Sequence, residues 1–160
     1  KRQSLEGLKM CFIGAGNNMA NSLINGGILA GMEVACACPL EYLPDEGITK
    51  RAQASGRFTL TQNVLEAAKD ADVLVTDVWA SMGEEAEAAQ RRKIFEGTYQ
   101  INDACMAVAK ADAMVLHCLP AHREEEITEK VFEAHADEIF DEAENRLHAQ
   151  KAVLVTLLKD

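Results

Sequence analysis

A histidine, a cysteine and a proline end an apolar run near the middle of the chain, in the segment MVLHCLPAH at residues 114–122. Pro120 has no backbone N–H, so we expect a strand to stop there and to release the carbonyl groups of Cys118 and Leu119 from the sheet. Such carbonyls can accept hydrogen bonds from a ligand amide, and a thiol is a weak acid that can donate to a carboxylate or exchange a proton with an amine. A reduced core cysteine beside a capped histidine explains the segment equally well, so both interpretations stay open.

An aspartate and an arginine elsewhere in the chain are also candidates for chemistry. Asp77 directly follows the apolar run VLVT, where removing a carboxylate from water is costly unless a cation is near. Ser81 and Met82 come next, and helix capping by Ser81 is one explanation for them. We expect Arg146 at the start of the last helix, where it either pairs with Glu142, four residues earlier, or binds an anion or a polarised carbonyl group.

The segment GAGNNM at residues 14–19 looks at first like a dinucleotide-binding fingerprint, but two parts are missing. Met19 stands where the third glycine belongs, and the next apolar run ends in ACACPLEY without an acid at its tip. A tight turn with an asparagine cap accounts for the glycines. The two asparagines nonetheless offer amide groups to a ligand, and a helix N-terminus favours a carboxylate.

These segments follow short apolar runs that are typical of strands buried in a parallel sheet. The predicted strands lie within KMCFIGAG (9–16), MEVACACP (32–39), ADVLVTDVW (71–79), AMVLHCLP (113–120) and DEIFDEA (137–143). Segments with helical spacing separate them, including one that starts near Pro44. The alternation predicts an α/β fold: an open, doubly wound sheet of about five parallel strands with helices on both faces. The candidate residues are expected to gather where those strands end.

Length and composition narrow the possible functions. The 160 residues suffice for a single domain, and a net charge of −10 argues against nucleic acid and anionic membranes as partners. We see neither a long apolar segment nor a signal-peptide pattern, so we expect a soluble, cytoplasmic protein. The five cysteines suggest reduced thiols, and Cys36 and Cys38 lack a second ligand pair, so no metal site and no cofactor are expected.

The last segment, AENRLHAQKAVLVTLLKD, predicts a helix that is apolar almost all round from Ala152 to Leu158. A terminal surface helix should have a polar face. Either this helix is buried in the core of the domain, or it docks on something absent from the sequence, and we favour the second alternative.

Taken together, GAGNN, DVWASMG, HCLPAH and DEAENRLHAQ, in this order and spacing, resemble the second half of the ornithine carbamoyltransferases, from about Leu8 to Leu158. HCLP is shared among related transcarbamoylases, whereas SMG after an aspartate-tryptophan pair is typical of those that bind L-ornithine. Ala15 departs from the pattern, since many relatives carry aspartate there. The resemblance implies that residues 1–160 form a single ornithine-binding domain, and that the carbamoyl-phosphate-binding domain with its Ser-Thr-Arg-Thr segment is absent.

The resemblance also implies which residues hold the amino acid. Asn18 would meet the carboxylate of L-ornithine, and Asp77 would pair with its α-ammonium group. Ser81 and Met82 would belong to a loop that closes over the substrate. These roles agree with a buried acid that requires a cation and with amide groups at a helix N-terminus.

A second set of residues would serve the carbamoyl group. Cys118 would lie near the δ-amino group of ornithine, the carbonyl groups of Cys118 and Leu119 would orient the carbamoyl NH₂, and Arg146 would hold the carbamoyl oxygen. Asp77 and Cys118 would help to lower the pKa of the amine and align it, and Arg146 would stabilise the oxyanion. The implied product is L-citrulline, made by a homotrimer as the full-length enzyme. A fragment that is inactive alone fits these features, as does a catalytically silent amino-acid-binding homologue or assembly module.

Overall fold

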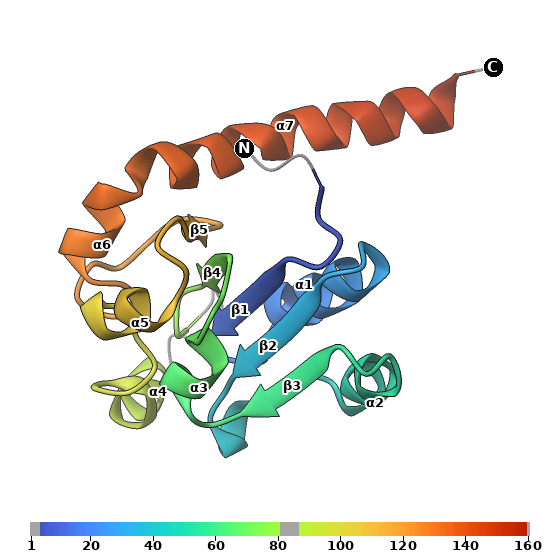
Figure 1. Cartoon of the computed structure of the whole chain (residues 1–160). Coiled ribbons are helices and arrows are strands. Elements are labelled where there is room, and N and C mark those ends of the chain that lie inside the picture. Colours follow the sequence, from blue (N-terminus) through green and yellow to red (C-terminus); the bar gives the residue numbers. More distant parts are fainter. Residues whose placement is uncertain (1–3, 81–86, 160) are drawn as a thin grey trace.

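The computed structural model describes residues 4–80 and 87–159 and contains one parallel, five-stranded sheet (Figure 1). The strand order is β3-β2-β1-β4-β5. Since the order reverses between β1 and β4, the crevice outside the carboxyl ends of these strands is the place where open α/β sheets bind ligands. The strands are β1 (Lys9–Ile13), β2 (Glu33–Ala37), β3 (Phe58–Thr61), β4 (Val73–Thr76) and β5 (Met114–His117).

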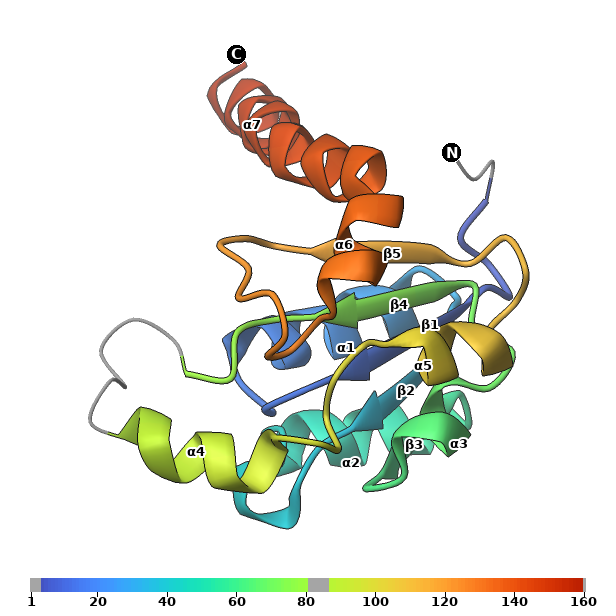
Figure 2. The same cartoon turned by 90° about the vertical axis from the view of Figure 1, so that its left-hand side faces the viewer.

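Helices cover both faces of the sheet, as predicted (Figures 1 and 2). Successive strand residues point to opposite faces, so Phe12 and Val75 pack on the side of α1 and α2, whereas Ile13 and Leu74 pack on the side of α3 to α7. The α-helices are α1 (Asn18–Leu29), α2 (Glu46–Ala54), α3 (Val64–Ala68), α4 (Ala88–Phe95), α5 (Asp103–Val108), α6 (Glu129–Ala134) and α7 (Ala136–Leu158), and a 3₁₀ helix spans Leu40–Tyr42.

Two strand assignments differ from the sequence prediction. The strand predicted within residues 137–143 is wrong, because these residues form the first turns of α7, in which Ile139 is fully buried. Two adjacent apolar residues are too short a pattern to separate a strand from a buried helical turn. Conversely, FTLT at Phe58–Thr61 forms the edge strand β3, which was missed because alternating threonines and partial burial give it no continuous apolar run.

Helix α7 takes the place next to β5 that a sixth strand would occupy. The backbone N–H groups of an edge strand need acceptors, and the N–H of Val115 donates to Oε2 of Glu138 at 3.1 Å. His135 also contacts this carboxylate, with Nδ1 and Oε2 2.8 Å apart. These bonds align α7 along the free edge of β5.

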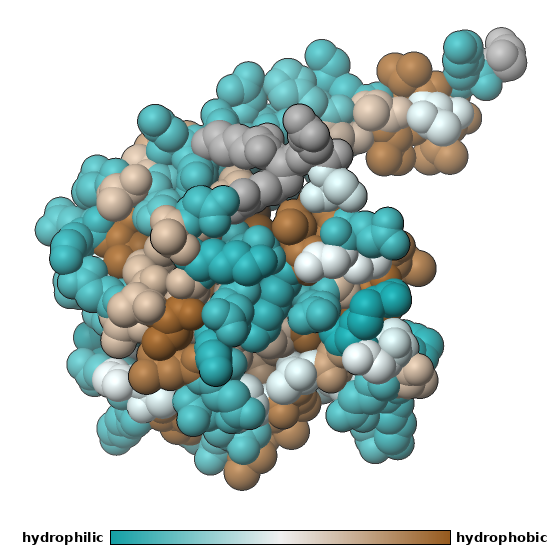
Figure 3. Space-filling model, viewed as in Figure 1, coloured by the Kyte–Doolittle hydropathy of each residue, from teal (hydrophilic) through white to brown (hydrophobic). Residues whose placement is uncertain are grey.

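The far end of α7 extends beyond the rest of the domain (Figures 1 and 3). Burial of this end within the domain, one of the two alternatives, is therefore wrong. The apolar residues are exposed on all sides of the helix, from 55% at Leu154 to 77% at Leu158. Despite this composition, no helix among the described residues meets the length and hydropathy required of a membrane span.

We expect Glu138→Ala to lower the free energy of unfolding by about 1–3 kcal/mol, because it leaves the edge N–H of Val115 without its acceptor. Glu144→Ala is the matched control, since Glu144 lies exposed on the same helix and its carboxylate pairs with the ring of His148. Urea denaturation of both variants measures the difference. Equal losses would show that the bond to the β5 edge contributes nothing.

Gly16 is required by the close approach of another segment. A Cβ at this position would lie 2.1 Å from the nitrogen of Pro44 and 2.2 Å from the carbonyl carbon of Leu43. We expect Gly16→Ala to cost at least about 2 kcal/mol of stability. Gly26 has open space around its Cβ position within α1, so Gly26→Ala should instead add about 0.5–1 kcal/mol. Thermal unfolding of both variants checks the opposite signs.

Candidate active site

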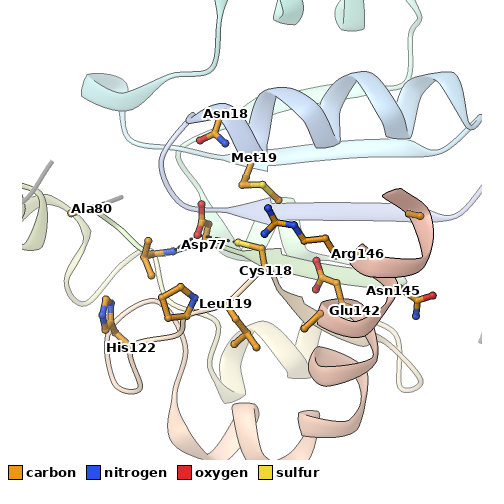
Figure 4. A pocket seen from close by; sticks show the side chains of 14 residues that line it. Asn18, Met19, Asp77, Ala80, Cys118, Leu119, His122, Glu142, Asn145 and Arg146 are labelled. Atoms are coloured by element: carbon orange, nitrogen blue, oxygen red, sulfur yellow. Dashed lines mark hydrogen bonds between the residues drawn. The ribbon is translucent and has the colours of Figure 1, made fainter. Parts of the chain in front are cut away.

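A pocket of about 980 Å³ opens at the carboxyl edge of the sheet (Figure 4). The N-terminus of α1, the segments after β4 and β5 and the middle of α7 form its walls. The predicted site residues that line it are Asn18, Asp77, Cys118, Leu119 and Arg146. Ser81 and Met82, which were predicted to bind the substrate, lie outside the described residues.

The register of β4 and β5 brings Asp77 and Cys118 together. Thr76 and His117 are partners in the parallel ladder, so the next residue of each strand lies at the same level of the sheet edge. The thiol of Cys118 donates to Oδ1 of Asp77 with an Sγ to Oδ1 distance of 3.2 Å. The contact joins residues 41 positions apart in the chain, which only the strand pairing can bring together.

Asp77 is a buried carboxylate whose hydrogen-bond partners, among the described residues, are neutral. Its side chain is 7% exposed and accepts hydrogen bonds from the amide of Asn17 and the N–H of Val78, both at 2.8 Å, and from Cys118. Among the residues that the structure describes, no lysine, arginine or histidine forms an ion pair with it. A buried anion of this kind favours a cationic ligand in the pocket.

Asn17, one of the two asparagines expected to offer an amide group to a ligand, instead donates to Asp77 and orients it. Its Oδ1 caps α1 by accepting from the N–H groups of Met19 and Ala20, and its amide nitrogen donates to Asp77. The asparagine cap was visible in the sequence, whereas the contact with Asp77 depends on the pairing of β1 with β4. Asn17 thus fixes the carboxylate, and Asn18 lines the pocket beside it.

Burial and the negative charge of Asp77 raise the pKa of the Cys118 thiol to about 12, and Glu142 adds to the effect. The thiol is therefore protonated at neutral pH and acts as a hydrogen-bond donor rather than as a thiolate nucleophile. Cys11, Cys36, Cys38 and Cys105 are buried, whereas Cys118 is half-buried at the pocket. Cys118 thus differs from the core thiols.

A buried pair of side chains holds the segment after β5. The N–H of Leu119 donates to Nδ1 of His117 at 2.9 Å, so the other ring nitrogen, Nε2, carries the proton and donates to Oε1 of Glu126 at 2.9 Å. The same oxygen accepts from the N–H of His122. Within the described residues, neither the carbonyl of Cys118 nor that of Leu119 accepts a hydrogen bond, so both can accept from a ligand.

Arg146 was predicted at the start of the last helix, and this position is wrong. The residue lies in the middle of α7, because the helix already begins at Ala136. Its exposed guanidinium makes no hydrogen bond or ion pair with another described residue, Glu142 included. The predicted alternative of a pair with Glu142 is therefore wrong. Figure 4 shows Arg146 and Glu142 on the same wall of the pocket.

Glu142, predicted only as an alternative partner of Arg146, also lines the pocket. Its Oε2 atom is buried without a hydrogen-bond partner. Burial and the charge of Asp77 raise the pKa of this carboxyl group, and the backbone N–H and ring of His117 oppose the shift. The spacing of four residues from Arg146 was the available signal, since both side chains then share one helix face.

Comparison with known proteins identifies the family of this chain. Residues 6–157 match the family model described as aspartate/ornithine carbamoyltransferase, Asp/Orn binding domain. The chain belongs to this family. The resemblance predicted from the four sequence segments is thereby confirmed.

The similar carbamoyltransferases are about twice as long as this chain. The ornithine carbamoyltransferase of Geobacter sulfurreducens is 50% identical over 156 residues, which cover 96% of this chain and 51% of the relative. The crystal structure of the ornithine carbamoyltransferase from Campylobacter jejuni superposes with a TM-score of 0.88 at 43% identity, covering 94% of this chain and 51% of that one. The enzyme from Pyrococcus furiosus gives 0.86 at 49% identity, covering 95% and 50%. The chain thus spans about half the length of the carbamoyltransferases it matches.

Asp77→Asn should increase the alkylation rate of Cys118 by iodoacetamide at pH 8–9, where an ordinary thiol begins to ionise. Removing the negative charge and the carboxylate acceptor lowers the pKa of the thiol, which raises the thiolate fraction. Asp103→Asn, a surface change at a residue paired with Lys130, is the control. Mass spectrometry of the Cys118 peptide measures the rates. An unchanged rate would show that Asp77 does not control the thiol.

Proposed function

We propose that this chain supplies the ornithine half of the active site of an ornithine carbamoyltransferase. The reaction would transfer the carbamoyl group of carbamoyl phosphate to the δ-amino group of L-ornithine, giving L-citrulline and phosphate. The observation that supports it most directly is Asp77, a buried carboxylate that faces a pocket and has no cationic partner in the described part of the chain. An amino acid with two amino groups provides the missing cation.

The pocket offers complementary groups for ornithine and for the carbamoyl group. The α-ammonium group of ornithine would bind Asp77, and its carboxylate would meet Asn18 at the N-terminus of α1, where the helix dipole favours an anion. On the other side, the free carbonyl groups of Cys118 and Leu119 would accept from the carbamoyl NH₂. Arg146 would stabilise the negative charge that develops on the carbamoyl oxygen.

The chemical step requires a neutral amine. Its nitrogen forms a bond to the carbamoyl carbon, the carbon–oxygen bond to phosphate breaks, and the proton lost by the amine passes to the leaving phosphate. A protonated Cys118 would help to align the δ-amino group without competing with it as a nucleophile. Ser81 and Met82 would contribute to binding the amino acid.

Phosphate binding would come from a second domain. The chain carries −10 net charge, and no lysine lines its pocket in the described part of the chain, so a carbamoyl-phosphate dianion would bind it poorly alone. The apolar end of α7 would dock on that domain, and the complete enzyme would be a cytoplasmic homotrimer with no nucleic-acid partner. This chain alone would be inactive.

The proposal is tested by joining this chain to the part of the Geobacter sulfurreducens relative that it does not match. We expect no citrulline from the isolated chain, and citrulline formation by the fusion. In the fusion, Asp77→Asn should reduce kcat/KM for ornithine by about 10- to 100-fold, the equivalent of one charged hydrogen bond.

Glu144→Gln, a neutralisation of an exposed carboxylate on α7, is the control and should leave kcat/KM unchanged. Ornithine binding to the fusion without citrulline, detected by calorimetry, would favour a silent amino-acid-binding protein instead. Turnover by the isolated chain would contradict the need for a second domain.

A further inference from the structure

A second group of polar side chains lies beside the pocket, in the segment between β5 and α6. The group consists of His122, Glu125 and Glu126, and each residue offers one oxygen or nitrogen atom within 4.8 Å of the others. It is the one such group of histidine, cysteine and acidic residues found among the residues described. None of the three has a role in the proposed carbamoyl transfer.

Glu126 gives this group an unsatisfied ligand atom. Its side chain is fully buried, and its Oε1 atom already accepts from the ring of His117 and the N–H of His122. The Oε2 atom is buried with no hydrogen-bond partner and lies 4.0 Å from Nδ1 of His122. A buried carboxylate oxygen without a partner costs free energy, and a cation at this position would remove that cost.

The backbone of the segment is already held in place. The N–H of Ile101 donates to the carbonyl of Glu126 at 2.9 Å, and the side-chain amide of Gln100 donates to the carbonyl of Glu125 at 2.8 Å. An ion would therefore require mainly side-chain adjustments. The exposed His122 can rotate, and the partly exposed Glu125 now pairs with Arg92.

We propose that His122, Glu125 and Glu126 form a binding site for a divalent transition-metal ion. One imidazole and two carboxylates suit Zn²⁺ or Co²⁺, and three protein ligands leave a coordination position for water. Because His122 also lines the pocket, the ion would tie its side chain to the buried Glu126 and restrain the segment that carries Leu119. The site does not depend on the proposed carbamoyl transfer.

The test is titration of the chelator-treated 160-residue chain with Co²⁺, followed by visible absorption, and with Zn²⁺, followed by calorimetry. We expect a single equivalent to bind and His122→Ala to weaken binding by more than about tenfold. His148→Ala is the matched control, because His148 also lies beside a carboxylate, that of Glu144, but has no third ligand among the described residues. Circular dichroism confirms folding, and His122→Gln replaces His122→Ala if that variant unfolds.

Two further variants distinguish this site from metal binding elsewhere on the chain. Arg92→Gln removes the guanidinium that competes for Glu125, so it should tighten Co²⁺ binding, and an unchanged affinity would exclude Glu125 as a ligand and overturn the site. Cys118→Ser should leave binding unchanged, whereas loss of binding would assign the ion to the thiol and overturn the proposal. Absence of binding up to about 1 mM metal would also overturn the proposed site, as would unchanged binding in His122→Ala and His122→Gln.

Discussion

The free edge of β5 is the constraint on which the pocket depends. An edge strand exposes backbone N–H groups, and here the carboxylate of Glu138 accepts one of them. This bond aligns α7 along the edge, and the helical repeat then places Glu142 and Arg146 on the same face, one and two turns further along. The same alignment carries the apolar end of α7 away from the domain (Figure 1). One helix therefore covers the free edge of the sheet, completes a wall of the pocket and leaves its apolar end exposed.

Asp77 is held by neutral hydrogen-bond donors, which leaves its carboxylate available to a cationic ligand. Asp77 is surrounded by an amide, a thiol and a backbone N–H, so its charge is stabilised but not neutralised. Arg146 lines the same pocket and forms no ion pair with a described residue. If the two had been paired, each would have lost part of its attraction for substrate. The arrangement suits a ligand that brings its own cation and a polarised carbonyl group.

Much of the site could be predicted because it lies at the ends of strands. The apolar runs before Asp77 and Cys118 mark β4 and β5, and the ends of parallel strands meet at one edge. The apolar pattern gave wrong secondary-structure predictions where a segment is only partly buried or has few apolar residues. The half-buried edge strand at Phe58–Thr61 has no continuous apolar run, and residues 137–143 were assigned to a strand from two apolar residues alone. The misplaced start of α7 led directly to the wrong position of Arg146 within its helix.

The α/β fold, the family and the residue types that gather at the carboxyl edge of the sheet follow from local apolar patterns and short motifs, so they could be predicted from the sequence. Which groups touch depends on the folded chain. The contact of Asn17 with Asp77, the raised pKa of Cys118 and the enclosed oxygen of Glu126 all depend on segments that lie far apart in the chain or turn back on themselves. Hydrogen bonds act over about 3 Å, and desolvation depends on every neighbouring atom, so both are set by packing rather than by sequence spacing.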